Sequence, residues 1–124
     1  RGAPMSHRFR PSVRLKSRPE FLPVQERGHR VATKYVTLLG LVNEHGHDRL
    51  GLIASRKFGN AVARNRAKRR LREIFRHSEP DTVGERGLKG LDLVAIPRRA
   101  MLGAPFAAVD EDFCTALTRI RGQA

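Results

Sequence analysis

The order of apolar and polar positions along the chain predicts six structural elements. Segments rich in β-branched or continuous apolar residues predict strands, and apolar residues that repeat at helical spacing predict helices. In chain order we expect a helix, two strands, a helix, a strand and a final helix, over residues 19–27, 30–42, 49–55, 61–76, 91–97 and from 105 onward. This order favours an α+β fold, a small single-domain sandwich in which helices pack on one sheet.

Several of these boundaries carry recognisable end signals. Pro19 suits the first turn of a helix and Gly28 can close it, although Pro23 lies one turn inside. Asn60 is a helix-capping residue directly before the second helix. The first two strands are separated by the polar turn 43–48, so we expect them to pair as an antiparallel hairpin.

The predicted helix 61–76 has two faces of opposite character. A helical wheel places its apolar residues on one arc: Ala63, Ala67, Leu71, Ile74 and Phe75. The opposite arc is basic and holds Asn65, Lys68, Arg69, Arg72 and Arg76, with Arg66 at its margin and Arg64 near the boundary. The pattern predicts a helix that packs its apolar side on the core and presents a basic side, which is either simply solvated or a binding surface.

Charge favours the second of these interpretations. The chain of 124 residues has a formal net charge of +13, and repulsion on this scale suits a polyanionic partner. Nucleic acid is the first candidate and an anionic membrane surface the second, but no apolar run approaches the roughly 20 residues of a spanning helix. Residues 1–18 contain six basic residues and no acid. We expect a flexible basic arm there, or a solubilising tail, followed by a single α+β domain at 19–121 that binds nucleic acid.

The residue types on the basic face suit nucleic acid. Arginine and lysine match phosphates, whereas Asn65 adds no charge and can instead position a base edge or a 2′-hydroxyl. Arg56 and Lys57 precede the helix and could form an anion site with its first amides, or simply a charged turn. Phe21 and Tyr35 could stack on unpaired bases, with service in the core as the alternative for each.

No constellation of a protein enzyme is evident in the sequence. A metal site could include His45, His47 and Asp48, but nothing else in the chain supplies a convincing further ligand. Cys114 falls within the last helix, and we interpret it as a small buried residue. A single cysteine allows no intrachain disulfide and fits a reducing compartment. The residues alone therefore indicate a binder of RNA or DNA.

The stretch RKFGNAVARNRAKRRLREIFR, residues 56–76, closely resembles the signature of the bacterial ribonuclease P protein subunit. That signature has Gly-Asn-Ala-Val, a variable residue, Arg-Asn-Arg, and further basic residues a turn later. It is matched by Gly59, Asn60, Ala61, Val62, Arg64, Asn65, Arg66, Lys68, Arg69 and Arg72. The stretch RLKSRPEF, residues 14–21, resembles the amino-terminal segment of the family, and the whole resemblance covers residues 14–121.

The resemblance implies a ribonucleoprotein function. The partner would be a large catalytic RNA, and the holoenzyme would be an endonuclease that removes the 5′ leader of precursor tRNA by metal-dependent hydrolysis. The RNA would provide the chemistry, so we expect no catalytic residue and no cofactor in the protein alone, Mg²⁺ in the holoenzyme, and a cytoplasmic location without a membrane partner. The implied crossover between the second and third strands is left-handed, although the general rule for parallel strands predicts a right-handed one.

The resemblance also assigns roles to particular residues. Its central helix would face the catalytic RNA, which implies contacts at Asn60, Arg64, Asn65, Arg66, Lys68, Arg69 and Arg72. The possible anion site at Arg56 and Lys57 completes the set of predicted RNA-binding residues. Phe21 would contact the leader in a cleft between the first helix and the sheet. Gln25 and Leu39 stand where members of the family often carry aromatic residues, so this cleft would offer fewer stacking surfaces. The alternative is a ribosomal or general RNA-binding protein with no role in cleavage.

Overall fold

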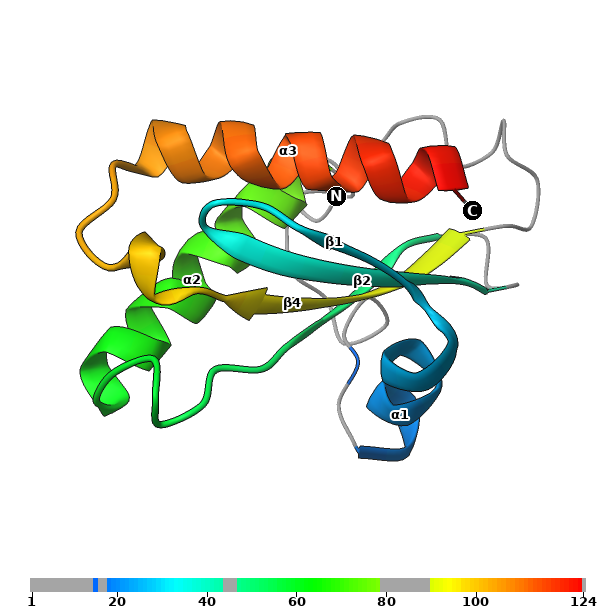
Figure 1. Cartoon of the computed structure of the whole chain (residues 1–124), viewed down its shortest axis with the longest axis horizontal. Helices are drawn as coiled ribbons and strands as arrows, with labels where there is room; N and C mark the ends of the chain where they lie inside the picture. Colours follow the sequence, from blue (N-terminus) through cyan, green and yellow to red (C-terminus); the bar gives the residue numbers. More distant parts are fainter. Residues whose placement is uncertain (1–14, 16–17, 44–46, 79–89, 124) are drawn as a thin grey trace, which may run out of the picture.

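The computed structural model describes residue 15 and residues 18–43, 47–78 and 90–123. Its elements are α1 (Arg18–Arg27), β1 (His29–Ala32), β2 (Val36–Asn43), β3 (Arg49–Leu52), α2 (Ala61–Ser78), β4 (Gly90–Pro97), the 3₁₀ helix η4 (Arg99–Met101) and α3 (Phe106–Gln123). One four-stranded sheet separates α2 and α3 on one face from α1 on the other (Figure 1). The predicted α+β sandwich is confirmed.

The strand order of the sheet is β1-β2-β4-β3. β2 pairs antiparallel with β1 on one edge and with β4 on the other, over all eight of its residues in the second case. Both edges of β2 are thereby occupied, so the predicted hairpin between the segments 30–42 and 49–55 is wrong. β3 instead pairs in parallel with β4, which makes β3-α2-β4 a β-α-β unit; its left-handed crossover stays a prediction of the resemblance.

The segment predicted as one strand, 30–42, is in fact two strands joined by a tight turn. The backbone amide of Thr33 donates to the carbonyl of Val36 at 2.9 Å and closes the turn. Asp112 of α3 holds it from outside, because its Oδ2 accepts hydrogen bonds from the Thr33 hydroxyl and from the amide of Tyr35. The break therefore depends on a contact with a residue far along the chain.

Two apolar cores lie on opposite faces of the sheet. The larger core fills the space under α2 and α3, and it contains Phe58 together with Phe75 of the predicted apolar arc. Tyr35 is half-buried and packs against this same core. The smaller core lies under α1 and is made by Leu15, Val24, Leu39 and Val94. None of the helices in the described part of the chain is long and apolar enough to cross a lipid bilayer.

Leu15 is attached to the sheet. Its side chain is buried, and its amide donates to the carbonyl of Leu50 in β3 at 3.0 Å. Of the predicted basic arm at 1–18, the structure describes only Leu15 and the first residue of α1; the rest lies outside the described residues.

Candidate nucleic-acid interface

The start of α2 is fixed by a cap and by a buried ring. The Oδ1 atom of Asn60 accepts a hydrogen bond from the amide of Ala63 at 2.9 Å, and its carbonyl accepts from the amide of Arg64 at the same distance. The side chain of Phe58 is buried just before this cap and anchors the turn to the larger core. The first turn of α2, and the side chains on it, are thus held in a defined position.

The two-sided character predicted for this helix is confirmed. Its apolar arc is buried at Ala67, Leu71, Ile74 and Phe75. We call the opposite side the basic face of α2 and define it by Arg64, Asn65, Arg66, Lys68, Arg69 and Arg72. Asn65, Arg66 and Arg69 are exposed, and the other three are half-buried, as expected when the stems of long side chains lie along the helix. The structure therefore brings these predicted site residues together on one surface.

Two arginines of α2 make hydrogen bonds within the chain. The Nη1 atom of Arg64 donates to the carbonyl of Gly59 at 2.8 Å, so this residue also secures the turn before the helix. Arg70 lies toward η4 and donates to the carbonyl of Ala104 at 2.7 Å. Arg70 thus ties α2 to the segment that follows η4, which is a structural role.

An acidic residue pairs with basic residues near the carboxyl end of α2. Glu73 is the single acid of the helix, and it contacts Arg76 and His77 one turn later. The hydrogen bond from His77, and then the charges of Arg76 and His77, hold the pKa of Glu73 below its ordinary value. The amino-terminal half of the helix carries no acid at all.

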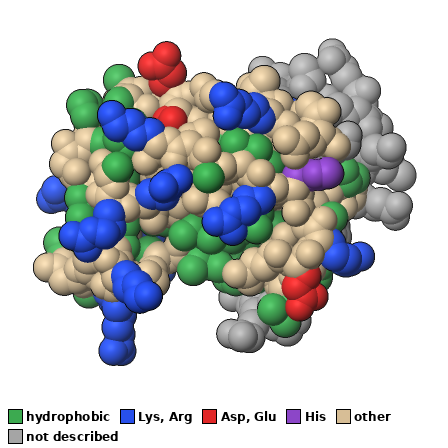
Figure 2. Space-filling view, in the orientation of Figure 1, with side chains coloured by type: hydrophobic (Ala, Val, Ile, Leu, Met, Phe, Trp, Pro, Cys, Tyr) green, Lys and Arg blue, Asp and Glu red, His purple; other side chains and the backbone are tan. Residues whose placement is uncertain are grey.

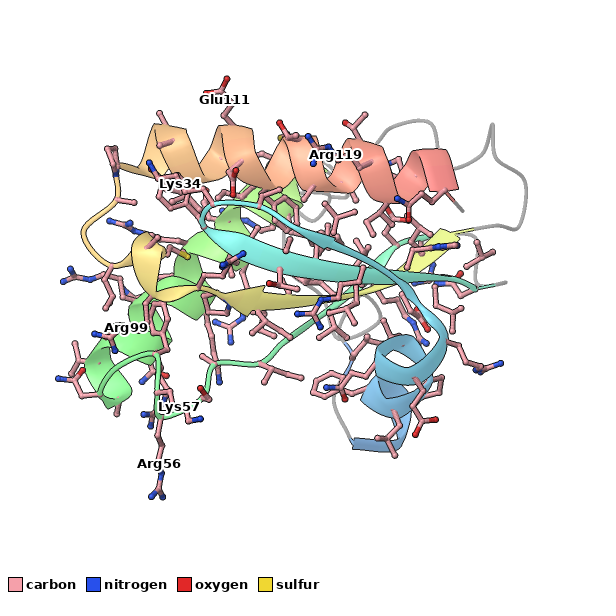
Figure 3. All side chains as sticks on the ribbon, in the orientation of Figure 1. Lys34, Arg56, Lys57, Arg99, Glu111 and Arg119 are labelled. Carbon is pink, nitrogen blue, oxygen red and sulfur yellow. The ribbon has the colours of Figure 1, made fainter. Side chains whose placement is uncertain are left out.

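The basic surface continues beyond α2 at the turn that precedes it. Arg56 and Lys57 are exposed there, and Figure 3 shows Arg56 extending away from the body of the molecule. Arg99 of η4 is also exposed and donates to the carbonyl of Lys57 at 2.8 Å. In Figure 2, Lys and Arg side chains are spread over the visible side of the molecule, and several lie at the lower left, where Figure 1 places the start of α2.

Arg98 and Arg99 extend this exposed basic surface, and neither was among the predicted site residues. Arg98 donates to the carbonyl of Thr33 at 3.0 Å and so reaches the β1–β2 turn. The available signal was the basic pair directly after Pro97, at the end of a buried strand.

A second surface lies where α1 meets the sheet. Phe21 is half-buried and packs on the smaller core, as Ile53 and Ile96 also do. Gln25 is exposed on α1 and Leu39 is buried within this core. Tyr35 packs against the other core, so the structure does not bring it together with Phe21.

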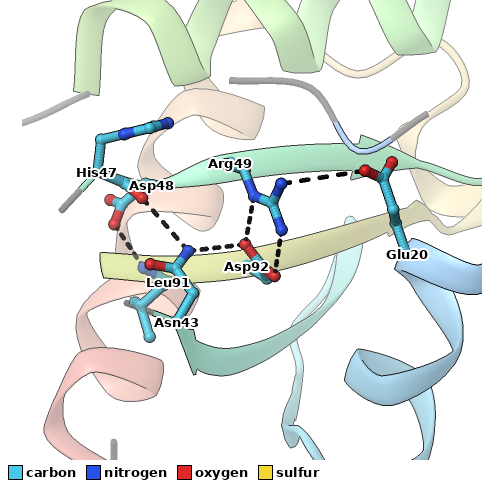
Figure 4. A network of polar contacts seen from close by, with 7 residues as sticks. All are labelled: Glu20, Asn43, His47, Asp48, Arg49, Leu91 and Asp92. Atoms are coloured by element: carbon cyan, nitrogen blue, oxygen red, sulfur yellow. Dashed lines mark hydrogen bonds and ion pairs between the residues drawn. The ribbon is translucent and has the colours of Figure 1, made fainter. Parts of the chain in front are cut away.

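A network of ion pairs holds α1 against the strands that carry this second surface (Figure 4). Arg49 of β3 donates from Nε and Nη2 to the two carboxylate oxygens of Asp92 in β4, each at 2.8 Å, and lies 4.0 Å from Glu20 of α1. The hydrogen bond to Asp92 is the main cause of a raised pKa for Arg49. Arg49 therefore links β3, β4 and α1 in one arrangement.

Asp48 has a structural role, because its side chain is hydrogen-bonded within the chain. Its carboxylate is fully buried and accepts hydrogen bonds from the amide of Leu91 at 2.9 Å and from Arg121 at 2.7 Å. These contacts tie the end of α3 to β4. Among the described residues no three His, Cys, Asp or Glu side chains come together as metal ligands, and His45 lies outside that part of the chain.

The prediction that Cys114 is buried is wrong. The residue is exposed. The buried residues of α3 are Val109, Phe113, Ala116, Leu117 and Ile120, and position 114 falls on the other side of that helix. Partial desolvation, together with the neighbouring carboxylate of Asp110, raises the pKa of the thiol, which opposes a role as a nucleophile.

The family of the chain follows from comparison with known proteins. A family model described as Ribonuclease P matches residues 9–121. A ribonuclease P protein component of Thermotoga petrophila is 36% identical over 95% of this chain and 100% of its own length. One from Gluconacetobacter diazotrophicus is 41% identical over 88% of this chain and 93% of its own.

Solved structures agree with the sequence comparisons. The RNase P protein from Thermotoga maritima, in complex with 1-(4-fluorophenyl)-2-thiourea, has a TM-score of 0.73 and 34% identity, covering 86% of this chain and 98% of that one. A Staphylococcus aureus RNase P protein mutant with defective mRNA degradation activity has a TM-score of 0.76 and 27% identity, covering 89% of each chain. With the fold, the signature on α2 and these relatives in agreement, the chain belongs to the ribonuclease P protein family.

Proposed function

We propose that this chain is the RNA-binding protein subunit of ribonuclease P, the endoribonuclease of tRNA 5′ maturation. In this proposal the basic face of α2 binds the catalytic RNA, and the surface at Phe21 binds the single-stranded leader of precursor tRNA. The observation that carries the proposal is the basic face itself. It sets Arg66 and Arg69, both exposed, beside Asn65 on a helix whose start is capped and whose other side is buried.

The geometry suits a phosphate backbone better than a small anion. The charged groups are spread along several turns of one helix and onto the preceding turn at Arg56 and Lys57. A spread of this kind matches successive phosphates, and each phosphate contact releases counterions. An uncharged Asn65 between two arginines adds hydrogen bonding to a base edge or a 2′-hydroxyl, which favours a fixed position on RNA.

The proposal leaves the chemical step to the RNA. Magnesium prefers oxygen ligands, usually including carboxylates. The described carboxylates of Asp48 and Asp92 are instead hydrogen-bonded to Arg121 and Arg49. These residues do not fit a magnesium site, so we assign the Mg²⁺ of the holoenzyme to the RNA and route no step through this chain.

Binding of the cognate ribonuclease P RNA across a series of salt concentrations tests the central part of the proposal. The variant carries Arg64→Ala, Asn65→Ala and Arg66→Ala together. The matched control carries Lys34→Ala and Arg119→Ala. These substitutions also remove two positive charges, but from exposed positions away from α2 (Figure 3). Thermal unfolding monitored by circular dichroism checks that both proteins fold.

We expect the triple variant alone to weaken binding, with the dependence of log K on log salt becoming shallower by roughly 0.7–0.9 for each lost phosphate contact. Equal losses in the two proteins would indicate general charge attraction without a defined face. Wild-type affinity in a folded triple variant would refute the assignment. The general or ribosomal RNA-binding alternative predicts binding of RNA without any effect on leader removal.

A further inference from the structure

An apolar pocket lies beside the basic face, between the first turns of α2 and the turn after η4. Its volume is about 250 Å³. Phe58, Ala67 and Met101 form its buried floor, and Val62 and Leu102 form its walls. Arg66 stands at its margin as part of the basic face.

The rest of the chain does not cover the two apolar residues that form the walls of the pocket. The side chain of Val62 is 70% exposed and that of Leu102 is 42% exposed. Leu102 is followed by Gly103, whose φ of 75° is a conformation that favours glycine and shapes the turn beside the pocket. Two apolar side chains are therefore held in water beside a concave apolar floor, which is typical of a surface that binds a partner.

The size of the pocket restricts the occupant. Pockets for drug-sized ligands usually measure about 300–1,000 Å³, so about 250 Å³ suits one flat ring system better than a helix or a peptide strand. The lining is mostly apolar, which suits the face of a ring, and its polar members are Asn60, Arg66 and Arg70.

The surroundings of the pocket specify the charge of the occupant. Arg66 is exposed at the margin, and the guanidinium of Arg70, which also lines the pocket, is held by the carbonyl of Ala104 at 2.7 Å. Asn60 caps Ala63, which leaves the amides of Ala61 and Val62 as donors of the first turn without an intrahelical partner. A flat apolar ring joined to an anionic group matches this combination, and a nucleotide has both parts.

Resting on the function proposed above, we propose that this pocket receives one unstacked nucleobase of the catalytic RNA. The base lies between Val62 and Leu102 on the floor made by Phe58, and its phosphate lies toward Arg66 and the first amides of α2. A base inside a duplex is stacked and cannot enter, so the ligand comes from a loop, bulge or junction. The pocket would thus set the register in which the basic face meets the RNA.

The test compares two variants that each remove exposed apolar side chains. The pocket variant carries Val62→Ala and Leu102→Ala. The control is Phe106→Ala on α3, whose side chain is 41% exposed and does not line the pocket. Each protein is titrated with the cognate ribonuclease P RNA at several salt concentrations, and the bound RNA is probed with reagents that modify unpaired bases. Thermal unfolding confirms the fold.

We expect the pocket variant to bind about tenfold more weakly with an unchanged salt slope, because apolar contact with the base is lost and no phosphate contact is. One unpaired base, protected by the wild type and by Phe106→Ala, should become reactive with the pocket variant. Identical affinity and identical protections would overturn the pocket while leaving the proposed function intact. Failure of the wild type to bind this RNA would overturn both.

Another occupant would give a different result. Sedimentation of the free protein measures whether it self-associates. Concentration-dependent dimers of the wild type that are lost in the pocket variant would assign the pocket to a second copy of the chain, and would overturn the assignment to a base.

Discussion

The ring of Phe21 on α1 lies directly over Gly51 of β3, where the sheet has no side chain of its own. A Cβ atom built at position 51 would overlap Cε1 of that ring and would come within 3.0 Å of the Cβ of Leu15. Gly51 therefore provides the space in which the ring rests on the sheet. The ring is half-buried, so one aromatic surface is fixed by packing while part of it stays accessible.

Replacing Phe21 by Ala should reduce the affinity of the holoenzyme for precursor tRNA by about tenfold, because stacking on an unpaired base is lost. Affinity for mature tRNA, which lacks the leader, should change by less than about twofold. Leu22→Ala is the matched control, since Leu22 is adjacent on α1 and 36% exposed. Filter binding of both tRNAs measures the ratio, and an equal loss for the two would place Phe21 in the core instead.

Gly51→Ala should disturb the same surface while Phe21 itself is unchanged. The added methyl group must displace Phe21, and overpacking of this kind costs roughly 1–3 kcal/mol of stability. The preference for precursor over mature tRNA should fall as it does for Phe21→Ala. Gly122→Ala serves as control, because its Cβ would meet nothing within 4 Å. Urea unfolding measures the stability, and binding of precursor and mature tRNA measures the preference. A Gly51→Ala protein with unchanged stability and unchanged preference would contradict the packing of Phe21 over Gly51.

Asn60 has a structural role that can be separated from contact with RNA. Asn60→Ala removes the acceptor for the amide of Ala63 and should lower the free energy of unfolding by about 1 kcal/mol. Asn60→Ser restores a capping oxygen and should recover most of that loss. The predicted RNA contact of Asn60 should make both variants bind RNA more weakly than the wild type. Recovery of affinity together with stability in the serine variant would instead assign Asn60 to the cap alone. If the serine variant recovers stability but not affinity, the Asn60 amide itself contacts RNA.

Glu73 should make stability depend on pH in the acid range. Its pKa is lowered in the folded protein, chiefly by the hydrogen bond with His77, from an ordinary value of 4.5. A lowered pKa contributes stability that is present above the ordinary value and is lost as the pH falls through the folded value. The difference in unfolding free energy between wild type and Glu73→Gln should therefore shrink between pH 7 and pH 3. A difference that stays constant over this interval would contradict the pairing.

The residues of α2 could be predicted from sequence because the information is local. Asn60, the apolar repeat at Ala67, Leu71 and Ile74, and the opposed basic residues all lie within five helical turns. Their periodicity determines which side is buried, whatever lies beneath it. The same holds for β4, which is apolar enough to be central and ends at Pro97.

The sheet order and the pocket could not be predicted because they depend on distant contacts. The turn at Thr33 lacks glycine and proline and is held by Asp112, 79 residues along the chain. β4 separates β2 from β3, although it follows β3 by about forty residues. The pocket joins Val62 to Leu102 in the same way. The local sequence at these positions does not indicate which distant residues they contact.

The central claim is tested most directly by cleavage of precursor tRNA at low magnesium with the cognate ribonuclease P RNA, with and without this chain. We predict that leader removal occurs only, or much faster, when the protein is present, and that the variant of Arg64, Asn65 and Arg66 loses this effect while staying folded. Tight binding of the RNA with no acceleration of cleavage would contradict the account and favour a general RNA-binding protein.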